Sequence, residues 1–258
     1  MTLVKPKKNL GQHFLRNEDI ARQIAESIVT SPENVLEIGP GMGVLTKYLI
    51  QQNYKNFNVV EIDRESVAYL QEHYPALREH IWSKDFLALN IDQLFEKQLT
   101  IIGNFPYNIS SQILFKVLDY KELVNEVVGM FQKEVAERVA AKPGNRQYGI
   151  LSVLLQTFYD IEYLFTVDEH QFFPPPKVKS AVIRLICNPE KKLSCDEKLF
   201  KQVVKAAFNQ RRKTLRNSLN QFNFPIEYRQ DALFTKRPEQ LSVQEFEQIC
   251  LHIIDDKQ

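Results

Sequence analysis

The tetrapeptide Asn104-Phe105-Pro106-Tyr107 combines residue types that can hold an aromatic amine. The amine of adenine is a poor nucleophile because its lone pair is delocalised into the ring. Two acceptors for its hydrogens, the Asn104 side-chain oxygen and the Pro106 carbonyl, would favour a more tetrahedral nitrogen that can attack a methyl group. The proline ring restrains the backbone here, and Tyr107 offers a flat face for a splayed-out base. A plain turn is the alternative, since Asn and Pro are common turn residues.

A glycine-rich segment, Glu37 to Gly43, lies between an expected strand and an expected helix. Glycine lets the backbone turn sharply and approach a ligand closely. The next expected strand ends in Glu61-Ile62-Asp63, and the Glu61 carboxylate can accept hydrogen bonds from ribose hydroxyls. We therefore expect Gly39, Gly41 and Glu61 to bind a nucleoside-containing cofactor. The loop alone also suits a dinucleotide enzyme or a structural turn, although the full dinucleotide fingerprint is not met.

Two further segments carry candidate ligands. Asp85 follows the third expected strand, where it could accept a hydrogen bond from an adenine amine while Phe86 packs on the purine face. The alternative is an N-cap beside a core aromatic. The run 172–177 reads Phe-Phe-Pro-Pro-Pro-Lys and could clamp the other face of a base. The alternative for this run is a proline-rich connection with two core aromatics.

Alternating strand and helix patterns in the first two thirds of the chain must position these segments. The pattern predicts strands over 34–38, 57–62, 80–83, 99–103 and 124–131, and helices over 18–29, 44–52, 64–73, 110–118 and 132–141. Asn17 is the expected N-cap of the first helix. Such alternation predicts a parallel sheet with helices on both faces.

The last part of the chain follows a different pattern. Two late strands are expected at 161–165 and 181–186, separated by a proline run that cannot lie in a central strand. From about residue 189 the pattern becomes helical. We therefore expect an α/β domain over residues 1–188 and a small all-helical domain over residues 189–258.

Composition narrows the class of protein. A chain of 258 residues fits one large domain plus a small one. No apolar run approaches the ~20 residues that span a bilayer, and the N-terminus lacks the apolar core of a secretion signal. A cytoplasmic location and no membrane partner are expected.

Cys187, Cys195 and Cys250 are scattered, so neither a disulfide framework nor a metal site is expected.

Charge is distributed unevenly although the formal net charge is only +1. Residues 1–16 and residues 201–220 each carry several Lys and Arg and no acid. Local basic patches favour binding to a phosphate backbone even when the total charge of the protein is small. Both segments therefore suggest contact with RNA, with a solvated surface as the alternative.

Six segments occur together and in order in a way that resembles the ribosomal RNA adenine dimethyltransferases, specifically the bacterial small-subunit enzymes. They are Lys8–Leu15, Glu37–Gly43, Glu61-x-Asp63, Asp85, Asn104–Tyr107 and Phe172–Val178. The resemblance covers about residues 5–220. It implies a Rossmann-like class I methyltransferase domain, a helical RNA-binding domain and S-adenosyl-L-methionine as cofactor. It also implies transfer of four methyl groups to two adjacent adenosines near the 3′ end of 16S rRNA in the assembling small subunit.

The same resemblance implies roles for individual residues. His13 and Leu15 would touch the cofactor, Gly39 would lie against its amino-acid part, Glu61 would bind its ribose, Asp85 would bind its adenine amine, and Asn104 would bridge cofactor and target. Phe172 would stack on the base opposite Tyr107. His13 is often Asn in relatives, which puts the contact of that side chain in doubt. Phe105 is usually Leu or Ile, and we expect little effect of this departure.

Three other functions compete with this interpretation. A resistance-type methyltransferase of large-subunit RNA is the nearest, but the form of segment 11–15 and the proline loop favour the small-subunit enzymes. A DNA adenine methyltransferase would usually begin the tetrapeptide with Asp and carry Pro at its second and third positions. A non-catalytic RNA-binding factor would not need the cofactor residues. The sequence does not specify an oligomeric state, and a monomer is the default.

Overall fold

The computed structural model of the protein describes residues 4–254. Within that range the chain forms two compact units. The first contains the residues up to 136 together with 161–187, and the second contains 137–160 and the residues from 188 onward. The segment 137–160 thus packs with the C-terminal part of the chain, whereas the sequence pattern had placed it within an N-terminal domain ending at residue 188.

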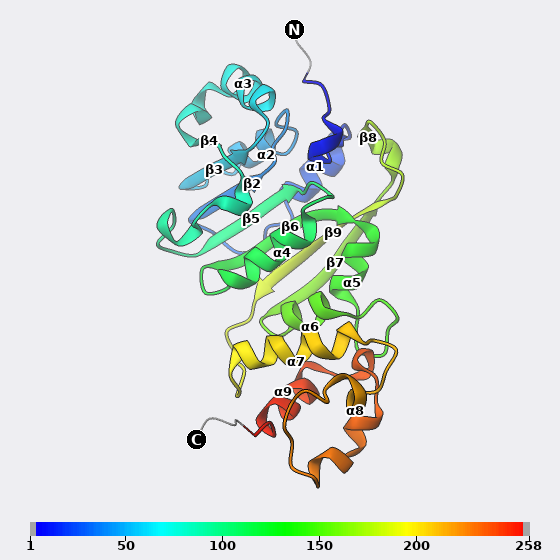
Figure 1. Cartoon of the computed structure of the whole chain (residues 1–258). Coiled ribbons are helices and arrows are strands. Elements are labelled where there is room, and N and C mark those ends of the chain that lie inside the picture. The colour runs from blue at the N-terminus through cyan, green and yellow to red at the C-terminus, as the bar shows by residue number, and fades with distance from the viewer. Residues whose placement is uncertain (1–3, 255–258) are drawn as a thin grey trace. The chain divides into compact units, whose positions relative to one another are not determined.

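A seven-stranded sheet forms the centre of the first unit (Figure 1), with the strand order β4-β3-β2-β5-β6-β9-β7. The strands are β2 Asn34–Ile38, β3 Asn56–Glu61, β4 Ile81–Ser83, β5 Leu99–Asn104, β6 Val124–Gln132, β7 Tyr159–Val167 and β9 Ser180–Cys187. The strands from β4 to β6 are parallel to their neighbours, and β9 runs antiparallel to β6. The predicted parallel sheet is therefore confirmed.

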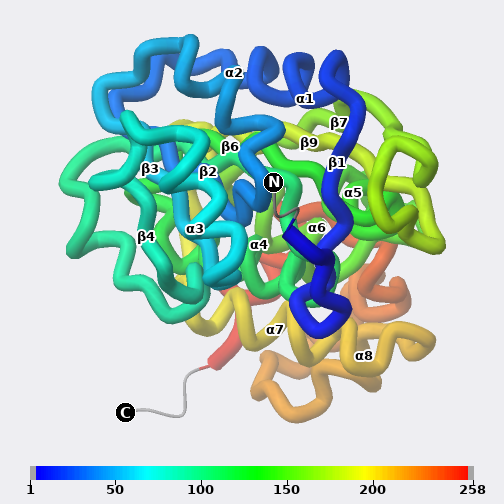
Figure 2. Tube along the Cα trace, turned by 90° about the horizontal axis from the view of Figure 1, so that it is seen from above, coloured from blue at the N-terminus to red at the C-terminus, as the bar shows by residue number. Residues whose placement is uncertain are grey.

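Helices cover the sheet on both sides. In the first unit they are α1 Glu18–Ala25, α2 Thr46–Gln51, α3 Arg64–His73 and α4 Ser110–Asp119, while α5 Lys133–Ala140 begins in the first unit and ends in the second. Figure 2 shows α1 and α2 on one face of the sheet and α4 on the other. The expected cap is confirmed, because the Asn17 side chain accepts a hydrogen bond from the Ile20 amide.

Helix α1 ends at Ala25, four residues earlier than predicted. The physical reason lies in β6, where Glu126 is fully buried. Its carboxylate accepts hydrogen bonds from the amides of Val29 and Thr30, at 2.9 and 3.1 Å. A buried carboxylate needs such donors, and satisfying it takes these two residues out of the helix.

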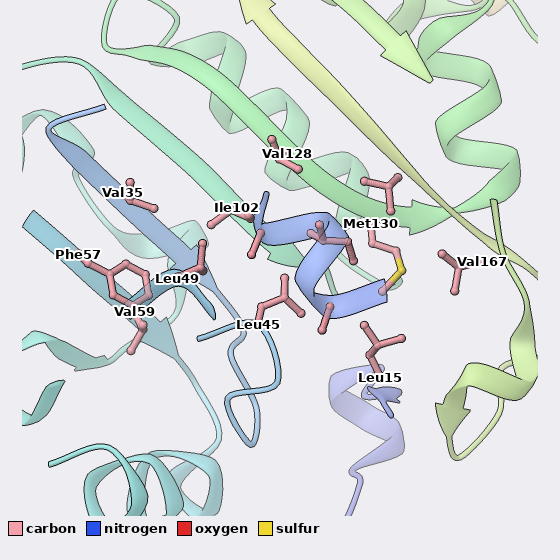
Figure 3. Close-up of a cluster of buried hydrophobic side chains, with 14 of the residues drawn as sticks. Leu15, Val35, Leu45, Leu49, Phe57, Val59, Ile102, Val128, Met130 and Val167 are labelled. Carbon is pink, nitrogen blue, oxygen red and sulfur yellow. The ribbon is translucent and has the colours of Figure 1, made fainter. Parts of the chain in front are cut away.

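Buried apolar side chains join α1 and α2 to the sheet (Figure 3). The strands contribute Val35, Val59, Ile102, Val128 and Met130, the segment from the glycine loop into α2 contributes Leu45 and Leu49, and α1 contributes Ala21, Ile24 and Ala25. Parallel strands buried on both faces favour such continuous Val and Ile runs. This core fixes the ends of the strands from which the polar residues project.

A second, two-stranded sheet was not predicted. It pairs β1, Phe14–Leu15, antiparallel with β8, Phe172–Phe173. Leu15 lies opposite Phe172, and Phe14 lies opposite Phe173. Because neighbouring side chains of a strand point to opposite sides, Leu15 and Phe172 enter the core together. The pairing also fastens the N-terminal segment to the loop that carries the proline run.

Among its described residues, the second unit contains α-helices, 3-10 turns and loops, and its strand residues are the first two of β7. Its α-helices are α6 Ile150–Gln156, α7 Glu197–Asn209, α8 Leu215–Ser218 and α9 Val243–Leu251. Capping fixes their starts: Asp196 accepts from the Leu199 amide, and Ser242 accepts from the Glu245 amide. Over residues 4–254, no helix has the length and apolar character needed to cross a membrane.

Candidate active site

A cavity lies where the neighbouring parallel strands β2, β3 and β5 end. It is lined by residues 10–14, Gly39, Gly41, Glu61, Ile62 and residues 104–107. Ligands of open α/β sheets bind outside the carboxyl ends of such strands. The structure thus brings together the glycine loop, the β3 acid, the tetrapeptide and His13, which lie far apart in the sequence.

Glu61 is fixed at the end of β3 by two backbone amides. Gly41 donates to one carboxylate oxygen at 3.1 Å, and Asp63 donates to the other at 2.8 Å. Burial raises the pKa of Glu61, and the amide hydrogen bonds oppose that shift. Gly39 and Gly41 have φ angles of 67° and 57°, which favour glycine. The loop and the acid therefore hold each other in place.

Glu37, at the carboxyl end of β2, is a second buried acid that sequence reasoning did not assign a role. It is 1% exposed, and the Thr46 hydroxyl donates to it at 2.7 Å. Burial raises its pKa to about 8, with a smaller contribution from the nearby charge of Glu61. A protonated Glu37 ties the start of the glycine loop to α2 without adding charge beneath the cavity.

The N-terminal residues 7–15, here called the strap, cross the edge of the cavity and are anchored on Asp63. The Lys7 ammonium lies 2.5 Å from one Asp63 oxygen, and the Gln12 amide donates to the other at 3.1 Å. Burial favours the neutral acid, but the hydrogen bonds from Lys7 and Gln12 outweigh it and lower the Asp63 pKa. The strap is thus fixed beside the strand end that carries Glu61.

Asn104 ends β5 with its side chain oriented by the strap. Its Nδ2 donates to the His13 carbonyl at 3.0 Å. This bond directs the amide nitrogen to the strap and leaves Oδ1 as an acceptor for another partner. The Pro106 carbonyl accepts from the Ile109 amide at 3.2 Å, and its second lone pair remains able to accept. Both acceptors that the amine chemistry requires therefore lie in one loop at the cavity.

Tyr107 and His13 place two aromatic rings at the cavity, with centroids 5.2 Å apart and planes tilted by 30°. The Tyr107 hydroxyl forms a hydrogen bond with Ser180 at the start of β9. Burial raises the pKa of Tyr107, so its hydroxyl is neutral at physiological pH. Two elements thus restrain the ring that the sequence assigns to base stacking.

Phe105, one of the two residues that depart from the family pattern, packs into the sheet. It is 1% exposed and meets Phe131 edge-on, with centroids 5.0 Å apart. A Cβ atom added at Gly129 would lie 2.3 Å from the Phe105 ring, and one at Gly103 would lie 2.9 Å from it. The two glycines make room for a side chain larger than Leu or Ile.

This packing predicts that Gly129→Ala destabilises the protein by ~1–3 kcal/mol, because overpacking forces neighbouring side chains from their rotamers. Phe105→Leu in the same chain should recover part of the loss, since the smaller side chain leaves space for the new methyl. Chemical denaturation of both single variants and the double variant measures the coupling. Strictly additive effects would contradict the proposed contact.

The structure places three of the sequence-predicted site residues away from the cavity. Leu15 and Phe172 are 4% and 3% exposed and belong to the core. The expected position of Phe172 opposite Tyr107 is not met here, because the β1–β8 register turns Phe172 inward and leaves Phe173 exposed. Asp85 is exposed and caps a 3-10 turn, accepting from the Leu87 amide at 2.9 Å.

Other residues at the cavity escaped sequence reasoning. Ile62 is 51% exposed, an unusual environment for isoleucine, and it directly follows Glu61 at the cavity. Its position after a strand-ending acid was the available signal. The sequence does not indicate that Gln12 and Asp63 form a hydrogen bond, because the strap and the end of β3 are distant in sequence.

Comparisons with known proteins agree with this geometry. A family model described as ribosomal RNA adenine dimethylase matches residues 4–254. A ribosomal RNA small subunit methyltransferase A of Bacteroides thetaiotaomicron is 60% identical over 251 residues, which cover 95% of this chain and 93% of that protein.

Two solved structures share the fold. A dimethyladenosine transferase from Plasmodium falciparum has a TM-score of 0.78 at 26% identity, covering 93% of this chain and 96% of that one. The 23S rRNA methyltransferase ErmE has a TM-score of 0.68 at 25% identity, covering 92% and 99%. The predicted class I methyltransferase fold is confirmed, and the chain belongs to the ribosomal RNA adenine dimethylase family.

Proposed function

We propose that the protein transfers methyl groups from S-adenosyl-L-methionine to the N6 amines of two adjacent adenosines near the 3′ end of 16S rRNA. The observation that carries this proposal is the orientation of Asn104, whose Nδ2 is bound to the His13 carbonyl. Its Oδ1 therefore remains able to accept a hydrogen bond from a donor such as an exocyclic amine. The family and the name of the 60% identical relative support a small-subunit substrate.

The cofactor would occupy the cavity beside the glycine loop. Gly39 and Gly41 allow the backbone to approach its amino-acid part, since a Cβ at Gly39 would meet only Pro106, at 3.8 Å. Glu61 retains lone pairs for the ribose hydroxyls, and the exposed Ile62 provides an apolar surface for the adenine. The strap residues from Leu10 to Phe14 close the cavity from one side.

Bound S-adenosylmethionine supplies an electrophilic methyl group on a positively charged sulfur. The protein's task is to present the adenine amine in line with that methyl group, which is chiefly a matter of positioning. Asn104 Oδ1 and the Pro106 carbonyl would accept the two amine hydrogens, and Tyr107 would support the ring. The nitrogen loses its proton readily once it carries the new methyl group, so no strong base is needed.

RNA phosphates would be held by the second unit, which contains the predicted helical RNA-binding domain over residues 189–258. Arg212, Lys213 and Arg216 are exposed around the start of α8. The Arg211 guanidinium binds the Arg146 carbonyl, which fixes this side chain instead of leaving it extended in solvent. Exposed cationic side chains in a segment without acidic residues favour binding to a phosphate backbone.

Replacing Arg212 and Lys213 by Gln should weaken binding to small subunits and flatten its salt dependence. Each lost phosphate contact removes a slope of about 0.7–0.9 in log K against log salt, so the pair should remove roughly 1.4–1.8. The matched control replaces the exposed Lys192 and Lys198 of the same unit by Gln. Equal slopes of log K against log salt for the two double variants would contradict phosphate binding by Arg212 and Lys213.

Mass mapping of 16S rRNA tests the proposed function. Deleting the gene in its host should remove two adjacent N6,N6-dimethyladenosines, and the wild-type gene should restore them while an Asn104→Ala gene does not. Purified protein should methylate unmethylated small subunits in the presence of S-adenosylmethionine. Methylation of large-subunit RNA alone would favour the resistance-type activity instead.

We also propose that the protein acts as a cytoplasmic monomer, at the place where small subunits assemble. The strap, the glycine loop, Glu61 and the tetrapeptide of one chain line a single cavity, which favours a monomer as the working unit. Sedimentation of the purified protein at its working concentration tests this point.

A further inference from the structure

The imidazole of His13 covers the Tyr107 ring at the cavity. The two ring centroids are 5.2 Å apart, and both residues line the cavity together with Asn104 and Pro106. The contact joins the strap to the tetrapeptide loop. Because Asn104 lines the same cavity, we expect an amine bound by Asn104 to bring its aromatic ring to the face of Tyr107 that His13 covers.

The His13 side chain is held in this position by the proline loop. Its Nδ1 lies 2.8 Å from the Pro174 carbonyl oxygen. A carbonyl can only accept, so Nδ1 carries the proton in this contact. The same residue is held a second time through its backbone, because its own carbonyl accepts from Asn104 Nδ2 at 3.0 Å. Ring and backbone of His13 thus have separate partners.

The gap between the rings is too small for a base. Non-bonded carbon atoms pack best at about 3.5–4 Å, so a base sandwiched between two rings needs roughly 7 Å between them. The observed 5.2 Å leaves room for direct contact of the two rings and for nothing between them. An adenine that stacks on the covered face of Tyr107 must first displace the imidazole.

We propose that the His13 ring gates the base pocket: it covers Tyr107 in the free enzyme, and the target adenine displaces it. This inference rests on the proposed function, which makes Tyr107 the stacking surface. Entry of the adenine breaks the Nδ1 bond to Pro174 and the ring contact. The bond from Asn104 to the His13 carbonyl is independent of the side chain and keeps the acceptor oriented throughout.

Steady-state kinetics of His13→Ala tests the gate. Removing the ring abolishes the cost of displacing it, so KM for unmethylated small subunits should fall about tenfold, equivalent to ~1.4 kcal/mol. The KM of each variant is measured at an S-adenosylmethionine concentration that calorimetry shows to be saturating, because His13 also lines the cavity proposed for the cofactor. An unchanged or raised KM for small subunits at saturating cofactor overturns the gate.

His73→Ala is the matched control. His73 also stacks on a tyrosine, Tyr69, with centroids 3.9 Å apart, and its Nδ1 also faces a backbone carbonyl. It lies on α3 and does not line the cavity. The control variant should match the wild type in both KM and cofactor Kd.

Nuclear magnetic resonance of histidine-labelled protein reports the ring directly. With S-adenosylhomocysteine bound, adding adenosine 5′-monophosphate should shift the resonances of the His13 ring, because the ring moves out of the ring-current field of Tyr107. The His73 resonances should not change. Absence of a His13 shift in an enzyme that methylates small subunits overturns the gate. An enzyme that methylates neither subunit refutes the proposed function instead, whatever the His13 signals do.

Discussion

Replacing Asn104 by alanine lowers the methylation rate of small subunits by roughly 10²–10³-fold, the expected cost of losing one preorganised polar group at the reacting atom. The side chain orients the amine through Oδ1 and is itself oriented by the His13 carbonyl, 3.0 Å from Nδ2. Alanine removes the acceptor and also releases one contact of the strap. Single-turnover rates with saturating cofactor and subunits measure the loss at the chemical step.

Asn108→Ala is the matched control for this prediction. Asn108 belongs to the same loop and also holds the strap, donating to the Asn9 carbonyl at 3.3 Å, but it is exposed and does not line the cavity. We expect its rate to stay within about threefold of the wild type, the loss of a single weak hydrogen bond. Equal losses in both variants would show that Asn104 acts by holding the strap. Wild-type turnover by Asn104→Ala would refute the mechanism.

Replacing Glu61 by alanine should weaken S-adenosylmethionine binding about 100-fold, or ~2.7 kcal/mol. Two causes add: the ribose loses a charged acceptor, and the Gly41 amide loses the carboxylate that it binds at 3.1 Å. Hydrogen bonds to charged groups contribute about 1.5–3 kcal/mol each. Affinity for small subunits should change little, because the proposed phosphate-binding residues Arg212, Lys213 and Arg216 lie in the other unit. Calorimetry for the cofactor and filter binding for subunits measure the two effects separately.

Two further variants sharpen the Glu61 prediction. Glu61→Gln keeps one acceptor oxygen and should lose less affinity than alanine. Glu33→Ala removes an exposed acid before β2, where it pairs with Lys55 away from the cavity, and should leave the cofactor Kd unchanged. A larger effect of Glu61→Ala on subunit binding than on cofactor binding would contradict the assignment.

The residue types and their order along the chain predicted much of the site. Apolar runs followed by Gly39, Glu61 and Asn104 indicated parallel strands ending in polar groups, and the structure brings these three ends together at one cavity. This inference works because parallel strands share one carboxyl edge. The predicted end of α1 was wrong because it depends on a long-range contact. The amides of Val29 and Thr30, beyond the last residue of α1, bind Glu126, a partner nearly a hundred residues away that local periodicity does not reveal.

Asn104–Tyr107 shows most clearly what the sequence by itself determined and what only the tertiary structure decided. Its residue types alone indicated an amine held by two acceptors beside an aromatic face. Three-dimensional packing decided the rest: the strap orients Asn104, two glycines admit Phe105, and His13 instead of Phe172 faces Tyr107. Strand register and long-range contacts place these groups. They depend on how distant segments pack, and a local pattern of residue types carries no record of that packing.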